Sequence, residues 1–163
     1  MEGTGREAGV QELERRRMEQ AFKPNEKYMR HAINLAKTAA GHTSPNPMVG
    51  AVIVKEDRII GLGCHERYGD LHAERKALGN LTEPAEGADM YVTLEPCPMC
   101  AGAIMNSRIR HVVFGARDAV KGACGSVIDL FYENFPDKAA VFGGVLAEES
   151  AEKLSTFFDS VRK

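Results

Sequence analysis

Short apolar runs and longer stretches of helical spacing alternate along this chain. Apolar runs bounded by turn residues predict buried strands, whereas apolar residues that recur at helical spacing predict helices. The expected strands are residues 49–54, 59–62, 90–94, 111–114 and 141–146. The expected helices are residues 25–41, 72–81, 99–107, 127–132 and 147–161, with turns or loops at residues 42–47 and 119–126.

The order of these elements predicts an α/β fold with three layers, α/β/α, around a mixed sheet of about five strands. A strand hairpin comes first, because Glu56, Asp57 and Arg58 separate two short strands. Helices then alternate with the later strands, an order that places helices on both faces of a sheet. The length of 163 residues suits one domain with one hydrophobic core.

The first part of the chain differs from the rest. Residues 1–9 are small and polar and are expected to be disordered, whereas residues 10–22 form a highly charged helix. The charge run at residues 14–17 is typical of a solvated helix face, and an RNA-facing surface is the alternative. We therefore divide the chain into an N-terminal extension, residues 1–23, and a main domain, residues 24–163.

Composition and charge indicate a soluble globular protein. Apolar residues make up 44% of the chain and charged residues 27%, a balance typical of a folded domain. The net charge of -2 excludes a strongly basic surface overall, although a local basic patch can still bind a nucleic acid. Neither a membrane-spanning run nor a secretory signal is found, so we expect a cytoplasmic protein.

Two short segments carry the candidate catalytic chemistry, His72-Ala73-Glu74 and Pro96-Cys97-Pro98-Met99-Cys100. In a reducing compartment, a close cysteine pair indicates metal or redox chemistry. One imidazole and two thiolates suit zinc, and three protein ligands leave the fourth position of a catalytic site open for water. Both segments are expected to begin helices, where thiolates are stabilised. We therefore predict that His72, Cys97 and Cys100 bind one zinc ion.

Glu74 is predicted to be the general acid and base. It follows His72 by two positions, so it can reach the open coordination position without binding the metal. Zinc lowers the pKa of its water, and Glu74 then carries protons to a ring nitrogen and to the departing ammonia. The alternatives are two unrelated core cysteines or a closed zinc site completed by Cys64, His65 or Cys124. Outside such a site, Cys64 and Cys124 are expected to fill small apolar spaces.

These residues match the zinc deaminase signature, and residues 25–161 resemble the cytidine-deaminase-like superfamily. From Met90 onward the chain is similar to the bacterial tRNA adenosine deaminases. The matching stretches are YVTLEPCPMCAGAI at 91–104, SRIRHVVFGARD at 107–118, GACGS at 122–126, GGVLAEE at 143–149 and the pair Phe157-Phe158. The sequence RDAVKG at residues 117–122 departs from the family's RDAKTG by moving the lysine one place.

Residues 28–78 resemble instead the deaminase domain of bacterial riboflavin biosynthesis. The stretches TSPNP at 43–47 and HERYGDLHAE at 65–74 carry this resemblance. It implies that Asn46 and His65 line the substrate pocket, whereas the tRNA enzymes have an asparagine in place of His65. The tRNA branch implies that Asp118 contacts the nucleotide backbone. The short Cys-x-x-Cys spacing, and a chain too short for a reductase domain, count against the riboflavin function.

Three functions compete at this point. The first is conversion of adenosine to inosine in a tRNA anticodon loop, where the base must leave its stack. The second is deamination of a small substrate such as a riboflavin-pathway pyrimidine, a free base or a nucleoside. The third is a zinc-stabilised binding module without catalysis. A basic groove beside the zinc would favour RNA, and a closed pocket would favour a small molecule.

The resemblance also implies a homodimer or a larger assembly. One residue of the Phe157-Phe158 pair faces away from the core, which leaves a base-stacking role open. The mixed resemblance suits an evolutionary intermediate, a specialised paralogue or a designed hybrid.

Overall fold

The computed structural model describes residues 4–39, 47–67 and 69–152, and its elements follow the predicted order. The helices are α1 (Thr4–Ala21), α2 (Glu26–Lys37), α3 (Ala73–Gly79) and α4 (Pro98–Asn106). The strands are β1 (Gly50–Lys55), β2 (Arg58–Cys64), β3 (Asp89–Leu94), β4 (His111–Ala116) and β5 (Ala140–Phe142). A further helix begins at residue 147.

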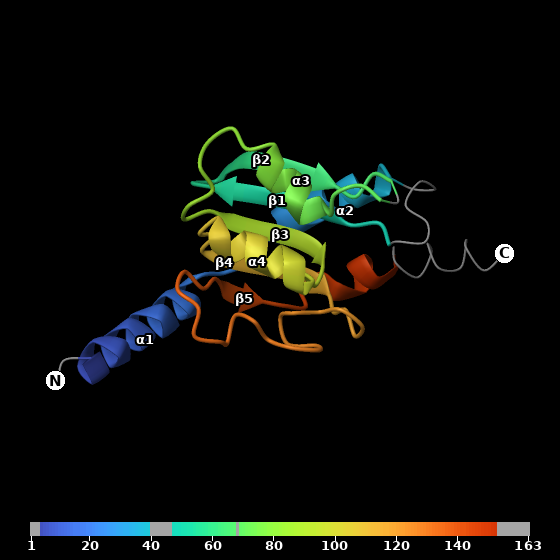
Figure 1. Ribbon diagram of the computed structural model, residues 1–163. Helices are drawn as coiled ribbons and strands as arrows, with labels where there is room; N and C mark the ends of the chain where they lie inside the picture. The colour runs from blue at the N-terminus through green and yellow to red at the C-terminus, as the bar shows by residue number, and fades with distance from the viewer. Residues whose placement is uncertain (1–3, 40–46, 68, 153–163) are drawn as a thin grey trace.

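The five strands form a mixed sheet in the order β2-β1-β3-β4-β5. Strand β1 is antiparallel to β2 and β3, whereas β4 is parallel to β3 and β5. Helices α3 and α4 cover one face of the sheet, and α2 lies behind the other (Figure 1). The predicted three-layer α/β/α fold is therefore confirmed.

The apolar side chains divide into two clusters, one on each face of the sheet. Ala77 of α3 and Ile104 of α4 belong to the first cluster, and Met29 of α2 belongs to the second. Helix α3 lies directly on β2, because a Cβ at Gly63 would come within 2.4 Å of the carbonyl oxygen of Ala73. The first turn of α3, which carries Glu74, is thereby fixed against the sheet.

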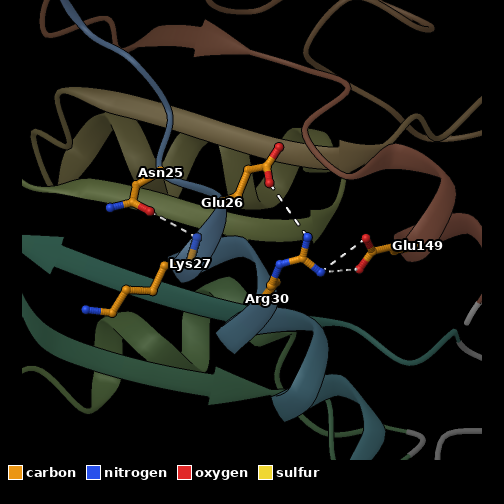
Figure 2. Close-up of polar contacts among 5 residues, drawn as sticks. All are labelled: Asn25, Glu26, Lys27, Arg30 and Glu149. Atoms are coloured by element: carbon orange, nitrogen blue, oxygen red, sulfur yellow. Dashed lines mark hydrogen bonds and ion pairs between the residues drawn. The ribbon is translucent and has the colours of Figure 1, made fainter.

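Polar contacts fix the first half of α2 (Figure 2). Asn25 caps its start, because the side-chain oxygen accepts a hydrogen bond from the backbone N–H of Lys27 at 3.0 Å. Further along, Arg30 donates to both carboxylate oxygens of Glu149, at 3.2 and 3.0 Å, and lies 3.7 Å from Glu26. These contacts join α2 to the helix that begins at residue 147.

The hairpin between β1 and β2 turns where the sequence predicted it. Glu56 and Asp57 both have positive φ angles, 50° and 58°. Such a pair of left-handed residues is the geometry of a tight two-residue hairpin turn. The turn sets the antiparallel register in which Lys55 pairs with Arg58.

One predicted element is wrong, and the bounds of another are wrong in part. Residues 127–132 form turns and one isolated bridge between Cys124 and Asp129, not a helix. The backbone N–H groups of this segment are satisfied by side-chain and loop acceptors, such as Asp129 Oδ1 for Phe131, which removes the need for helical bonds. The last strand ends at Phe142 rather than residue 146, because Gly144 adopts a φ of 84°.

The N-terminal region is more helical than expected. Residues 4–9, predicted to be disordered, belong to α1, which extends away from the rest of the structure (Figure 1). The sequence of α1 is rich in Glu and Arg. These charged residues suit a helix face in contact with solvent, as the charge run predicts.

Several predictions fall outside the described residues. They are the turn at residues 42–46, the pocket residue Asn46 and the pair Phe157-Phe158. Among the described residues, no helix is both long and apolar enough to cross a membrane.

Candidate metal centre

Three residues converge where α3 and α4 begin. His72 is the N-cap of α3, Cys97 is the N-cap of α4, and Cys100 lies in the first turn of α4. The Nδ1 atom of His72 lies 3.7 Å from the Sγ atom of Cys97 and 3.4 Å from that of Cys100. All three ligand atoms lie within 4.8 Å of one another, so one ion can contact all of them.

The two thiols of this group are not equivalent. A hydrogen bond from the Cys100 thiol, together with the nearby His72 imidazole, lowers the pKa of Cys97 to about 5. The same hydrogen bond and burial raise the pKa of Cys100. Cys97 is therefore the sulfur that is already ionised near neutral pH, and a thiolate is the form that binds a metal. Metal binding must displace the proton that the two sulfurs share.

The donor set fits zinc. Imidazole nitrogen and thiolate sulfur are the ligands that zinc accepts at tetrahedral sites. Among the described residues, no fourth His, Cys, Asp or Glu belongs to the group. A closed site completed by Cys64, His65 or Cys124 is thus not formed by these residues. Three protein donors leave one position for a solvent molecule, as in catalytic zinc sites.

Glu74 lies buried beside the three converging residues, with 4% of its surface exposed. Its side chain interacts with Cys100, and burial is the main cause that raises the pKa of the carboxyl. A carboxyl with a raised pKa holds a proton more readily, as a group that both accepts and donates a proton during catalysis must. The same position on the first turn of α3 keeps Glu74 outside the ligand group.

A pocket opens beside the metal centre, and Glu74 lies in its wall with two of the three converging residues. His65 and Asp118, which the family resemblance implied, also line this pocket. The adjoining loop reaches the pocket at Pro47, next to Asn46, which lies outside the described residues. Two of the three predicted substrate-binding residues are therefore placed at the pocket.

His65 forms part of the pocket wall directly after β2. Its side chain is buried, and its Nδ1 atom lies 3.1 Å from the carbonyl oxygen of Leu71. The ring meets that of His72 edge-on, with 6.0 Å between the ring centroids. His65 is therefore buried and held in a defined orientation next to His72.

Two pocket residues, Glu95 and Lys121, were not predicted as site residues. Glu95 follows β3 and is 2% exposed, and its carboxylate accepts hydrogen bonds from the loop at residues 117–126. Although burial raises its pKa, the hydrogen bonds from Ser126 and from backbone N–H groups hold it below the ordinary value. The available signal was an acidic residue at the end of a buried strand, two positions before Cys97.

Comparisons with known proteins show which families this chain resembles. The family profile described as "Cytidine and deoxycytidylate deaminase zinc-binding region" matches residues 22–116. The riboflavin biosynthesis protein RibD of Aquifex aeolicus (strain VF5) is 44% identical over 137 residues, covering 80% of this chain and 38% of that protein. The tRNA-specific adenosine deaminase of Bacillus subtilis (strain 168) is 43% identical over 151 residues, covering 85% and 91%.

A riboflavin-pathway deaminase of about the same length as this chain is also similar to it. The diaminohydroxyphosphoribosylamino-pyrimidine deaminase of Buchnera aphidicola subsp. Schizaphis graminum (strain Sg) is 38% identical over 142 residues, covering 83% of this chain and 94% of that protein. Chain length therefore does not count against the riboflavin function, contrary to the expectation from the sequence.

A solved structure shows the same fold. It is the diaminohydroxyphosphoribosylaminopyrimidine deaminase/reductase of Thermotoga maritima, with a TM-score of 0.73 and 38% identity over 84% of this chain and 41% of that one. The chain spans only about two fifths of the RibD proteins that it matches. The profile match covers more than half of the chain and includes His72, Cys97 and Cys100, so the chain belongs to the cytidine and deoxycytidylate deaminase family.

Proposed function

We propose that this chain converts adenosine to inosine in a tRNA anticodon loop. The observation that carries the proposal is the loop at residues 117–126, which borders the pocket with Asp118 and Lys121. This loop lies in the part of the chain that resembles the tRNA adenosine deaminases, and the match to the Bacillus subtilis enzyme covers 91% of that protein. A base turned out of its stack can enter toward Glu74 while its sugar and phosphate stay at the mouth.

Four residues at the metal centre have distinct roles in this proposal. His72, Cys97 and Cys100 would hold the zinc, which would supply a polarised water molecule. Glu74 accepts a proton from that water and passes it to the adjacent ring nitrogen. As the water oxygen bonds to the carbon that bears the amino group, Glu74 takes the second proton, from the new hydroxyl group, and gives it to the amino nitrogen. The C–N bond breaks, ammonia leaves, and a carbonyl group remains.

Substrate contacts are assigned by resemblance and by place in the pocket. Asp118 is proposed to contact the nucleotide backbone, and Asn46 and His65 the base or ribose. Lys121 is exposed at the same edge, where a cation can pair with a phosphate. A phosphate accompanies both candidate substrates, so Lys121 is compatible with either.

A second candidate is deamination of diaminohydroxyphosphoribosylaminopyrimidine. His65 favours it, because the buried imidazole occupies a wall position where the tRNA enzymes have asparagine and the riboflavin enzymes have histidine. Charge favours it too, since Lys121 is the one Lys or Arg among the described residues that line the pocket. An RNA groove is expected to be more basic.

The two candidates can be separated by one assay. Zinc-loaded protein is incubated with an anticodon stem-loop that carries adenosine at the wobble position and, separately, with diaminohydroxyphosphoribosylaminopyrimidine, free bases and nucleosides. Ammonia release with inosine in the stem-loop is the expected result. Product from the pyrimidine phosphate alone would replace the first function by the second. No ammonia from any substrate would contradict both.

We also propose that the chain acts as a homodimer. Large apolar side chains remain exposed on the described surface, and exposed apolar groups favour association. They include Met99, Val127, Ile128, Tyr132 and Phe135. Sedimentation equilibrium is expected to give twice the mass of one chain, and a purely monomeric mass at micromolar concentration would contradict this.

A further inference from the structure

We infer that Glu95 is a positioning residue, which holds the loop at residues 117–126 against the active-site pocket and thereby sets the affinity for substrate. This role concerns the deaminase pocket itself and applies to either candidate substrate. Glu95 lies between the strand that leads to the zinc ligands and the loop that carries Asp118 and Lys121.

The carboxylate of Glu95 accepts four hydrogen bonds from this loop. Its Oε1 atom accepts from the backbone N–H groups of Cys124 and Ser126, both at 3.0 Å. Its Oε2 atom accepts from the backbone N–H of Asp118 at 3.0 Å and from the hydroxyl of Ser126. Hydrogen bonds to an ionised acceptor are roughly twice as strong as those between neutral groups. One side chain is therefore hydrogen-bonded to both ends of the loop.

The loop is also built to fit closely around this carboxylate. A Cβ at Gly122 would lie 2.4 Å from Glu95 Cδ, so a larger residue would push the two apart. The backbone N–H of Ala123 donates to the carbonyl oxygen of Pro96 at 2.8 Å, beside the zinc ligand Cys97. The loop and the zinc-binding turn are thus joined at two adjacent positions, Glu95 and Pro96.

The orientation of the pocket residues depends on this anchoring. Asp118 gives its N–H to Glu95, and its own Oδ1 accepts from the N–H groups of Val120 and Lys121, at 2.9 and 3.0 Å. Glu95 therefore fixes the turn that places Asp118 and Lys121 at the edge of the pocket. A shift of this turn moves both side chains relative to Glu74.

Glu95 is a positioning residue and not a second proton shuttle. Both of its carboxylate oxygens are already hydrogen-bonded by loop donors, which leaves no oxygen directed at a substrate. Loss of Glu95 should therefore weaken substrate binding more than it slows the chemical step.

The test compares Glu95→Gln with Glu83→Gln. Glutamine keeps the shape of Glu95 but places an NH₂ group against two of the loop donors. The control removes the charge of a partly buried glutamate that pairs with Arg58 at 3.0 Å. Bound zinc, thermal unfolding, KM and kcat on the substrate that the wild type turns over, and amide hydrogen exchange in residues 117–126 are measured for each protein.

We expect Glu95→Gln to raise KM by about tenfold, with a smaller change in kcat, unchanged zinc content and exchange about tenfold faster within the loop. Ser126→Ala, which removes one hydroxyl donor, is expected to change KM and exchange in the same direction but less. This milder variant decides the matter if Glu95→Gln does not fold. Glu83→Gln is expected to match the wild type.

Unchanged loop exchange in either folded variant would overturn the inference, as would a loss of kcat at unchanged KM. The exchange rates also separate this inference from the proposed function. If the wild type deaminates neither candidate substrate, the substrate proposals fail, and faster or unchanged exchange in the loop still decides whether Glu95 holds it.

Discussion

Two histidines lie at opposite ends of the central strands, and each is close to an acidic side chain. At one end, His72 lies beside the two cysteines and the buried Glu74, in the wall of a pocket. At the other, His111 and Asp89 begin β4 and β3, and the imidazole Nδ1 lies 2.6 Å from the carboxylate. The Phe22 ring stacks on His111 with 3.8 Å between centroids.

The two histidine sites differ in the other residues that surround each imidazole. His111 is 3% exposed and enclosed by aromatic rings, and among the described residues it belongs to no group of three possible metal ligands. The first end instead brings three possible metal-binding atoms within 4.8 Å of one another. A buried histidine next to a carboxylate is therefore not by itself a functional site, and converging soft ligands with an open pocket distinguish the metal centre.

The largest difference is expected when each histidine is removed. His72→Ala deletes one of the three predicted zinc ligands, so bound zinc and turnover should both fall to background. His111→Ala deletes a stacked and hydrogen-bonded ring, so it should keep zinc and turnover but lower the free energy of unfolding by about 1–3 kcal/mol. Metal analysis, ammonia release and denaturant unfolding measure the three effects. Loss of zinc from His111→Ala would contradict the assignment.

Substitutions of the two acidic neighbours, Glu74 and Asp89, should differ in their effects in the same way. Glu74→Gln is expected to lower kcat by about 10²–10⁴-fold with zinc still bound, because the proton shuttle is lost. Asp89→Asn serves as its matched control and should leave kcat nearly unchanged while reducing stability. Steady-state kinetics with zinc analysis test both variants. Turnover that survives Glu74→Gln would show that another group carries the protons.

A smaller effect is expected on the reactivity of the thiols, which should distinguish Cys97 at the metal centre from Cys124. The lowered pKa of Cys97, about 5, makes it a thiolate at pH 7, whereas burial raises the pKa of Cys124. In metal-free protein, iodoacetamide should therefore modify Cys97 at least about tenfold faster than Cys124. Added zinc should protect Cys97. Peptide mass spectrometry follows both sites, and equal rates without metal would argue against the ionised sulfur.

The smallest expected effect is on acid stability. The pKa of Glu95 is lower in the folded protein than the ordinary carboxyl value of 4.5. Below that value the unfolded chain binds a proton that the folded chain does not, so this contribution to stability is present above it and is lost as pH falls through the folded pKa. Glu95→Gln should reduce the slope of stability against pH in this window, measured by denaturant unfolding. An unchanged slope would count against an ionised Glu95.

The sequence predicted those parts that depend on local spacing. Short patterns predicted the hairpin at Glu56 and Asp57 and the strands of the sheet. Short motifs also picked out His72, Cys97 and Cys100, which the starts of α3 and α4 bring together. The role of Glu95 was not predicted, because its donors lie 23 to 31 positions further along the chain. The helix expected at residues 127–132 does not form, because N–H groups of this segment bond instead to the carbonyl oxygens of Gly122 and Ala123 and to the Asp129 side chain.

X-ray absorption at the zinc edge tests the central claim most directly, because it counts the atoms bound to the metal. For the zinc-loaded protein, the account predicts one zinc per chain, bound by two sulfur atoms, one imidazole nitrogen and one oxygen from solvent. In Cys97→Ser, one of the two sulfur atoms should be lost. A site with four protein donors, or a protein that binds no zinc while its fold is intact, would contradict the account.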